Sequence, residues 1–331
     1  MNGTVAVLGI APFDPVAERS RLGGLERWLT DPAVTEVMVN AGSEVWVERD
    51  GTLDRVGTMR PAAVLAAIEQ VLGPIGRRLD RASPTVDARL HDGSRVCAVI
   101  PPVAVDGPTL SIRRFAVRPI ALGAFTSPEV VALLQRVVAA RCNVVVSGPT
   151  SSGKTTLLNA LAAGIGPSER IVTLEDIAEL RLGHPHVVRL ETRPASPDGV
   201  GAVGLADLVR TALRLRPDRL VVGEVRSAES VELLQAMNTG HDGSLSTVHA
   251  NSATDVLARI ASLVVQHVPG WRLADVREHV GRAIDVVVHV TRGGDGRRRI
   301  DAVVEVSASD GAVRVLARDG HVVAELHRRR R

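Results

Sequence analysis

Hydrophobic and polar positions follow two different patterns along the chain. In the first part they alternate in short stretches typical of β-strands, and the Asp50-Gly51 and Asp92-Gly93 pairs are favourable hairpin turns. The expected strands span 36–40, 44–48, 86–90, 95–100 and 110–115, and the expected helices span 19–29 and 61–72. Short strands in hairpins with few helices predict a small α+β domain over 19–117, after an irregular stretch at 1–18.

After a stretch without periodicity at 118–128, which we interpret as a linker, helices and strands alternate. Ser127 is the expected N-cap of the first helix, with Pro128 at its first position. The expected helices span 129–140, 155–163, 204–215, 228–237 and 253–264, and the expected strands span 143–147, 171–175, 220–222, 245–248 and 286–290. Apolar strands between helices predict an α/β domain over 129–331, in which helices cover both faces of a parallel sheet. Two or three further strands are expected at 300–326, before a basic end at Arg328–Arg331.

Composition excludes several classes of protein. The chain has 331 residues, 45% hydrophobic and 23% charged, which is ordinary for a globular protein of about two domains and excludes a disordered or fibrous chain. No run of ~18 apolar residues predicts a membrane-spanning helix, and the N-terminus lacks the basic start of a signal peptide. The two cysteines, Cys97 and Cys142, lie in no motif, so neither a disulfide framework nor a zinc cluster is expected. We therefore expect a cytoplasmic protein.

The basic residues are almost all arginine. Of 40 lysines and arginines, Lys154 is the one lysine, and the formal net charge is only +3. Codon bias in a GC-rich genome explains an excess of arginine, which makes the retained lysine informative. The chain has three Phe, three Trp and no Tyr, so it offers few platforms for stacking the bases of single-stranded nucleic acid. Direct nucleic-acid binding is therefore disfavoured.

Residues 148–155 have the pattern G-x-x-x-x-G-K-T, between an apolar strand and a helix, which is the context of a phosphate-binding P-loop. Glycines let the backbone N–H groups turn toward phosphate oxygens, and the following helix adds its positive N-terminal end. Lys154 would reach the terminal phosphates, and Thr155 would offer its hydroxyl to Mg²⁺. The expected nucleotide-binding residues are Gly148, Pro149, Thr150, Ser151, Ser152, Gly153, Lys154, Thr155 and Thr156. The alternative is a glycine-rich turn without a ligand.

Three carboxylates follow buried strands, at the edge of the sheet where ligands bind in doubly wound folds. Gly223–Glu224 stands where P-loop enzymes usually carry an Asp–Glu pair, so Glu224 is the candidate base that activates water. The metal would then be held by Thr155 together with Glu175 or Asp176. The alternative for Asp176 and Glu224 is capping of the next helix.

Two histidines flank the strand expected at 245–248. His249 ends the strand and could contact the terminal phosphate, although a lone histidine is more often structural. His241 lies in a glycine-rich turn, where a structural role is the simpler interpretation.

The motifs together resemble those of the type II/IV secretion and type IV pilus ATPase superfamily. The four matching blocks are GPTSSGKTT (148–156), VTLEDIAEL (172–180), PDRLVVGEVR (217–226) and TGHDGSLSTVHAN (239–251), which resemble its Walker A, Asp, Walker B and His boxes. ERWLTDPAVTEVMVN and LHDGSRVCAVIPPVAVDGPTLSIRRF in the first part are also similar. The resemblance covers about residues 20–290 and is greatest to the tight-adherence (Flp) pilus assembly branch, also labelled conjugal-transfer-associated. Cys97 departs from the Asn expected in this branch.

The resemblance implies a RecA-like P-loop domain and a Mg²⁺-dependent ATPase that forms a homohexameric ring. It implies that ATP binds between the two domains, with Arg95 and Arg113 or Arg114 of the first domain neutralising phosphate charge and Arg216 and Arg226 as second candidates. It also implies a cytoplasmic protein at the inner face of the cell membrane, with platform proteins of a pilus or secretion system as partners.

The sequence is also compatible with two other functions. A conjugative DNA-transfer motor would share the same motifs, and a relative that binds nucleotide without hydrolysing it would need the P-loop but not Glu224. Arg328–Arg331 could contact anionic lipid, or it could be a solvated tail.

Overall fold

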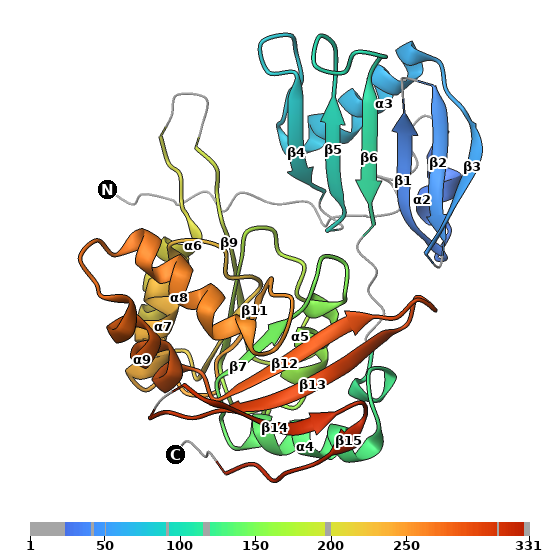
Figure 1. Ribbon diagram of the computed structural model, residues 1–331. Helices are drawn as coiled ribbons and strands as arrows, with labels where there is room; N and C mark the ends of the chain where they lie inside the picture. Colours follow the sequence, from blue (N-terminus) through green and yellow to red (C-terminus); the bar gives the residue numbers. More distant parts are fainter. Residues whose placement is uncertain are drawn as a thin grey trace, which may run out of the picture. The chain divides into compact units, whose positions relative to one another are not determined.

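The computed structural model describes residues 24–40, 43–49, 51–90, 93–114, 120–195, 200–309 and 311–327 (Figure 1). The chain divides into two compact units, Met1–Val117 and Arg118–Arg331, and each is described by itself. The irregular N-terminus expected at 1–18 and the basic end at Arg328–Arg331 lie outside the described residues.

The first unit is an antiparallel sheet with two helices. Its strands lie in the order β3-β2-β1-β6-β5-β4. Its elements are α2 (Glu26–Thr30), β1 (Val34–Asn40), β2 (Glu44–Arg49), β3 (Thr52–Thr58), α3 (Pro61–Leu72), β4 (Thr85–Arg89), β5 (Arg95–Val99) and β6 (Thr109–Arg113). Alternate residues of β1 and β2 and one face of α3 form one core, to which Val39, Val47, Val64 and Ile68 contribute. The helix bounds at 61–72 match the expected ones, because Pro61 suits the first turn and Gly73-Pro74 ends the pattern.

The second unit is built on a nine-stranded sheet in the order β15-β14-β13-β12-β7-β11-β10-β8-β9. The strands from β12 to β9 pair in parallel, and β13 to β15 extend the sheet in antiparallel pairs. Its strands are β7 (Val144–Ser147), β8 (Ile171–Glu175), β9 (Val187–Glu191), β10 (Arg219–Val222), β11 (Leu245–Val248), β12 (Val286–Arg292), β13 (Arg298–Val306), β14 (Val313–Arg318) and β15 (His321–Val322). Its helices are α4 (Pro128–Ala139), α5 (Lys154–Ala162), α6 (Leu205–Ala212), α7 (Glu229–Asn238), α8 (Asp255–His267) and α9 (Leu273–Ala283).

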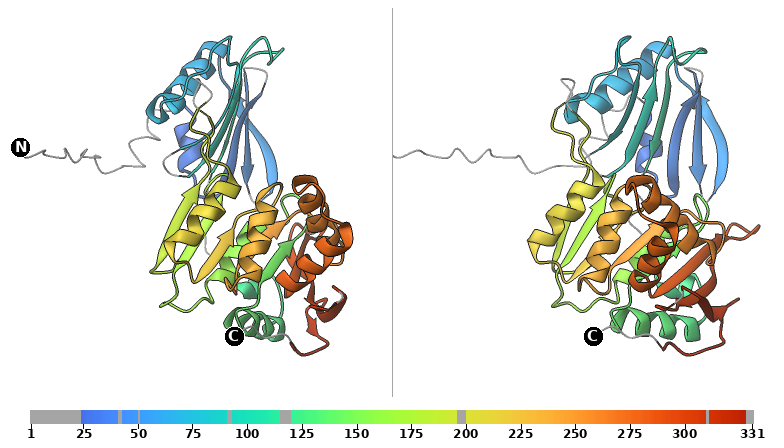
Figure 2. Two further views of the ribbon diagram at one scale, coloured as in Figure 1. Left: turned by 90° about the vertical axis from the view of Figure 1, so that its left-hand side faces the viewer. Right: turned by 60° about the vertical axis from the view of Figure 1, so that its left-hand side comes forward.

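Helices cover both faces of this sheet (Figure 2). Successive residues of a strand point to opposite faces, so Val145 of β7 joins the core under α6, α7, α8 and α9, whereas Val144 and Val146 join the core under α4 and α5. Because the central strands are parallel, their carboxyl ends share one edge, which is where the P-loop follows β7.

Three strands or helices, β3, β9 and α9, are not among the ranges expected from the sequence, although the Asp50-Gly51 turn indicated a strand after it. The segment interpreted as a linker is partly packed. Ile120, Leu122 and Phe125 lie against the core under α4 and α5. Ser127 caps α4 as predicted, because its Oγ accepts a hydrogen bond from the Val130 N–H at 3.5 Å. Among the residues described, no helix is long and apolar enough to cross a bilayer.

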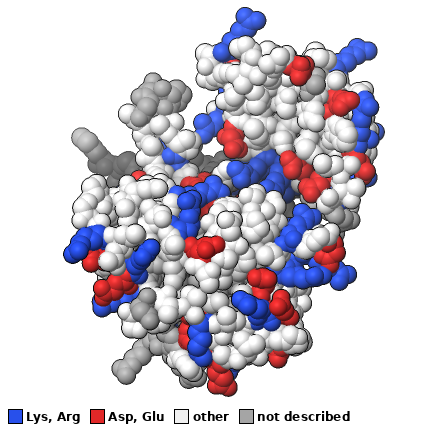
Figure 3. Space-filling model, viewed as in Figure 1, with Lys and Arg blue, Asp and Glu red and all other residues white. Residues whose placement is uncertain are grey.

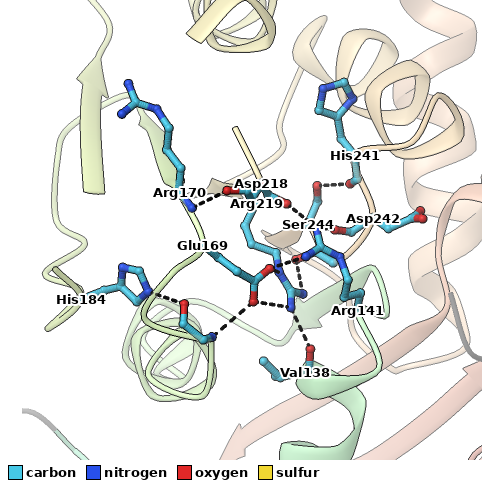
Figure 4. Close-up of polar contacts among 12 residues, drawn as sticks. Val138, Arg141, Glu169, Arg170, His184, Asp218, Arg219, His241, Asp242 and Ser244 are labelled. Atoms are coloured by element: carbon cyan, nitrogen blue, oxygen red, sulfur yellow. Dashed lines mark hydrogen bonds and ion pairs between the residues drawn. The ribbon is translucent and has the colours of Figure 1, made fainter. Parts of the chain in front are cut away.

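Basic and acidic side chains are interspersed over the face shown in Figure 3. A more unusual group of charges is buried at the amino ends of β8, β10 and β11 (Figure 4). The Arg219 side chain is only 2% exposed and donates from Nε to Glu169 at 2.7 Å and from Nη2 to the Val138 carbonyl at 3.1 Å. Arg141 also pairs with Glu169 and donates to the Asp218 carbonyl at 2.7 Å. This cluster joins three strands at the edge of the sheet opposite the P-loop.

A glycine is required beside this cluster. Gly243 has a φ of +82°, and a Cβ on it would lie 1.8 Å from Nη1 of Arg219. The Arg219 guanidinium therefore fills the space that a side chain at residue 243 would need.

Replacing Glu169 by Gln should destabilise the fold by about 3 kcal/mol at pH 7, because it leaves Arg219 buried without its counter-charge. Burial raises the pKa of Glu169, but the hydrogen bond and charge of Arg219, with the charge of Arg141, outweigh burial, so the pKa lies below its ordinary value of 4.5. A carboxyl group whose pKa is lowered in the folded protein stabilises the fold at pH values above 4.5, its ordinary pKa. This stabilisation is lost as the pH falls through the lowered pKa. Urea unfolding should thus show a wild-type advantage at pH 7 that shrinks below pH 4.5. Glu278→Gln, in an exposed pair with Arg282, is the matched control, and equal losses in both variants would contradict the prediction.

Candidate nucleotide site

The loop between β7 and α5 has the backbone of a phosphate cradle. Gly153 has a φ of +98° and precedes the first residue of α5, Lys154, so the chain turns sharply into the helix. At the other end of the loop, a Cβ on Gly148 would lie 2.2 Å from the carbonyl oxygen of Val290. A side chain at residue 148 would clash with the Val290 carbonyl, and the backbone conformation at residue 153 favours glycine, so both positions require glycine. The loop also lies at the N-terminus of a helix, where anions bind.

Lys154 lies within this loop with only 8% of its surface exposed. Its Nζ donates to the carbonyl oxygens of Gly148 at 3.0 Å and Pro149 at 2.9 Å, and it lies 3.3 Å from Nδ1 of His249. Burial lowers the pKa of Lys154 below its ordinary value, Glu224 opposes this shift, and Arg226 adds to it. The ammonium group is thus held over the loop by weak carbonyl partners that a phosphate could replace.

Lys154 lies next to His249, and His249 lies next to Glu224. His249 follows the carboxyl end of β11, and Glu224 follows that of β10. His249 Nε2 lies 2.8 Å from Oε1 of Glu224, and Arg226 pairs with the other oxygen of the same carboxylate. Burial lowers the pKa of His249, and the charges of Lys154 and Arg226 lower it further against the opposing effect of Glu224. Nζ of Lys154 also lies 3.5 Å from Nε2 of His249, so the ammonium group lies beside the ring, and Nε2 is close to Oε1 of Glu224 without forming a hydrogen bond with it. The sequence assigned Lys154, Glu224 and His249 to the phosphate site separately, and in the structure the three side chains lie together.

A pocket of about 370 Å³ opens beside this group, lined by Thr150, Glu224, Val225, Arg226, His249 and Arg259. Thr150 of the phosphate loop, the Glu224 carboxylate and the His249 imidazole therefore line the same space. The space can hold the terminal part of a phosphate ligand and a water molecule. Arg259, on α8, was not expected at the site, because it lies in the middle of an ordinary amphipathic helix with no motif around it.

Glu175 ends β8 as expected, but one of its two carboxylate oxygens is engaged in shaping the next loop. Its side chain is buried, and Oε1 accepts from the N–H groups of Glu179 and Leu180 at 2.8 Å each. Oε2 is buried and has no hydrogen-bond partner. Burial raises the pKa of Glu175 to about 7, against the two backbone hydrogen bonds. Gly223 makes room for this side chain, since a Cβ there would lie 2.9 Å from Cγ of Glu175.

The remaining metal candidates are less enclosed. Asp176 is exposed, and its carbonyl accepts from Oγ1 of Thr192 at 2.9 Å. Thr155 lies in the first turn of α5 and is half-buried. Within the described ranges, no group of three or more His, Cys, Asp or Glu side chains could hold a metal ion by itself. Mg²⁺ in phosphate sites typically takes one or two protein ligands and completes its shell with phosphate and water, so these residues fit such an ion.

The candidate arginines divide between the two units. Arg95 of β5 is the register partner of Arg113 of β6 and also of Arg89 of β4, so three arginines form a row across one end of the first unit's sheet. Arg95 also lies 3.6 Å from Asp87 in an exposed pair. Arg114 instead donates from Nη1 to the carbonyl oxygens of Asp31 and Val34 within its own unit.

Two candidates in the second unit lie away from the P-loop. Arg216 precedes β10, and His241 precedes β11, so both are at the amino ends of the strands, the opposite edge from Gly148. The carbonyl of His241 accepts from Oγ of Ser244 at 2.8 Å, as expected for a structural role (Figure 4). Arg226 alone of the second candidates lies at the site.

Comparisons with known proteins match most of the chain. Residues 18–315 match the family of type II/IV secretion system proteins. A putative conjugal transfer protein of Mycobacterium tuberculosis is 41% identical over 315 residues, 90% of this chain and 88% of that protein. The type IV secretion system protein PtlH of Bordetella pertussis is 35% identical over 340 residues, 91% of this chain and 98% of that protein. The crystal structure of the pilus retraction motor PilT with bound ADP shares the fold, with a TM-score of 0.64 at 21% identity over 84% of this chain and 82% of that one.

Proposed function

Because the chain belongs to the type II/IV secretion system protein family, we propose that it is a Mg²⁺-dependent ATPase that acts as a homohexameric ring. Its work would be to power assembly of a Flp-type pilus or export of protein across a membrane. The contact of Lys154 with His249, and of His249 with Glu224, is the observation that supports hydrolysis, because it joins the phosphate loop to a base. We place the protein in the cytoplasm at the inner face of the cell membrane, with platform proteins of a pilus or secretion system as partners.

In this proposal the backbone of residues 148–156 binds the phosphates and Lys154 neutralises the terminal one. Glu224 accepts a proton from the attacking water, and the proximity of His249 keeps the carboxylate directed at the loop. Arg226 also holds Glu224, so the carboxylate is positioned from two sides before a ligand enters. A terminal phosphate would draw Lys154 away from the Gly148 and Pro149 carbonyls, which leaves His249 next to the phosphate.

Mg²⁺ would be held by Thr155 and Glu175, with Asp176 as an outer ligand, and it would supply charge neutralisation of the phosphates. The buried Oε2 of Glu175, which lacks a hydrogen-bond partner, supports this assignment.

Glu175→Gln should therefore raise the Mg²⁺ concentration needed for half-maximal phosphate release by about tenfold or more, since it removes charge near the ion. The amide keeps an oxygen for the N–H groups of Glu179 and Leu180, so the loop should survive. Magnesium titrations of wild type, Glu175→Gln and the distant control Glu278→Gln test this expectation. An unchanged requirement would remove Glu175 from the metal site.

The arginine row of the first unit supplies positive charge for phosphate neutralisation in this proposal. Arg89, Arg95 and Arg113 are register neighbours on three strands, with Asp87 paired to Arg95 and Glu36 opposite Arg113 on β1. We propose that Arg95 and Arg113 contribute to phosphate neutralisation, with Arg114 positioning the end of β6.

If the arginines come from a neighbouring subunit, phosphate release per subunit should rise with protein concentration and level off as rings of six copies form. Arginines of this kind are worth ~10³–10⁵ in rate, so dispersed subunits should be nearly inactive. Light scattering and phosphate release on the same dilution series would test this. A constant rate per subunit across dissociation would refute the ring requirement, whereas no release at any concentration would favour a nucleotide-binding protein without turnover.

A DNA-transfer motor is the second candidate, and the relative named as a putative conjugal transfer protein is the observation in its favour. The net charge of +3 and the scarcity of aromatic residues favour the pilus or protein-export role. Binding of single-stranded DNA at moderate salt, with a steep salt dependence, would reverse this order.

A further inference from the structure

We propose that Arg298, on β13, binds the α-phosphate of the nucleotide. The inference rests on the proposed function, since it assumes that the P-loop holds a nucleoside di- or triphosphate. It concerns the side of the loop that faces away from Glu224 and His249.

The β12–β13 hairpin packs against the P-loop at both glycines of the motif. The carbonyl oxygen of Val290, on β12, lies 2.2 Å from where a Cβ of Gly148 would be, and Cδ of Arg298 lies 2.5 Å from where a Cβ of Gly153 would be. Nε of Arg298 is 3.1 Å from that same Gly153 position. Two glycines that the phosphate motif requires are thus each in contact with this hairpin, and the Arg298 stem lies across the second one.

Strand order sets which end of the phosphate chain Arg298 faces. β7 lies between β11 on one side and β12 on the other, with β13 next to β12. Glu224 and His249 follow β10 and β11, and they mark the terminal-phosphate side, where Lys154 lies. Arg298 lies on the opposite side, where the chain of phosphates leads back to the nucleoside.

The guanidinium lies beside the first turn of the helix that follows the loop. Nη1 of Arg298 lies 3.5 Å from Oγ1 of Thr156, in the first turn of α5. Backbone N–H groups of a P-loop hold the α- and β-phosphates, so a donor at this turn is well placed for an α-phosphate oxygen. A guanidinium offers several N–H donors in one plane and keeps its charge at all accessible pH values, which suits it to phosphate.

The neighbouring residue provides a matched control. Arg298 is half-buried on the same side of β13 as the buried Ile300, whereas Arg299 is exposed on the other side and pairs with Asp295. Arg298→Ala and Arg299→Ala therefore remove the same charge from adjacent positions, one facing the loop and one facing away. Arg298→Lys keeps the charge and guards against misfolding of the alanine variant.

The test is the affinity for ADP and for the two diastereomers of ADPαS, measured by calorimetry at one fixed Mg²⁺ concentration. In wild type, sulfur at the oxygen that Arg298 contacts should weaken binding more than sulfur at the other oxygen. Arg298→Ala should weaken ADP binding about tenfold or more and change the ratio between the diastereomers at least threefold. Arg298→Lys should lose less affinity, and Arg299→Ala should match wild type.

Weaker ADP binding with an unchanged diastereomer ratio would show that Arg298 only packs against the loop, and the proposal would be wrong. Unchanged ADP binding in Arg298→Ala would also overturn it while leaving the proposed function intact. Absence of ADP binding by the wild-type protein would instead refute the proposed function, so the two failures are distinguishable.

Discussion

Glu224→Gln should abolish turnover and leave ATP binding intact. The amide cannot accept a proton from water, and loss of a general base costs about 10²–10⁴ in rate. The loop and Lys154 are unchanged, and removal of a negative charge beside Lys154 lessens repulsion of the terminal phosphate. We therefore expect ATP affinity equal to or a few times tighter than that of wild type. Phosphate release and ATP binding, measured on the same preparation, give both halves of the result.

The control for this variant is Glu278→Gln, which removes an exposed carboxylate from α9 and should keep the parent rate. Hydrolysis by Glu224→Gln at the rate of the parent would show that another group activates the water. Loss of ATP binding together with turnover would show that Glu224 shapes the loop through His249 and Arg226 and does not act as the base.

The second large effect is expected from Lys154→Ala, which should weaken ATP binding by about 100-fold and reduce phosphate release to background. A charge-assisted contact with a phosphate is worth about 1.5–3 kcal/mol, and in this chain no second lysine could substitute. The truncation also leaves the Gly148 and Pro149 carbonyls without their donor.

Lys154→Arg should not restore activity. Only 8% of Lys154 is exposed, so the planar guanidinium lacks room where a compact ammonium fits between two carbonyls and His249. Thermal unfolding of both variants checks that the fold persists. If Lys154→Ala binds ATP as tightly as wild type, the nucleotide does not lie on this loop.

Most helices and strands were predictable because the hydrophobic positions in their sequences are the positions that they bury in the core. The P-loop domain with a smaller α+β domain is confirmed, as is the membership of the secretion family. Strands such as Ile171–Glu175 and Leu245–Val248 have the expected bounds because they are short, apolar and closed by turns. β9 was missed because Val187–Glu191 is a half-buried edge strand with polar residues, and α9 was missed because Leu273–Ala283 contains many charged residues.

At the site, residues inside motifs were predictable and residues outside them were not. Lys154, Glu224 and His249 lie together because each follows a parallel strand of one sheet, which the alternation of strands and helices already indicated. Arg259 and Arg298 reach the same loop from a helix and from an antiparallel strand far along the chain. No local pattern distinguishes them from the other arginines, so only the three-dimensional arrangement identifies them. Glu175 was expected beside the metal, but its second task, accepting from the Glu179 and Leu180 N–H groups, depends on how the next loop folds.

If the loop at 148–156 binds a nucleoside triphosphate, titration of ATP with Mg²⁺ into Glu224→Gln protein in a calorimeter should show it. We expect about one ATP bound per chain with a dissociation constant in the micromolar range, and loss of that binding when Lys154→Ala is added. Absence of binding at millimolar ATP, or binding that Lys154→Ala leaves unchanged, would contradict this expectation.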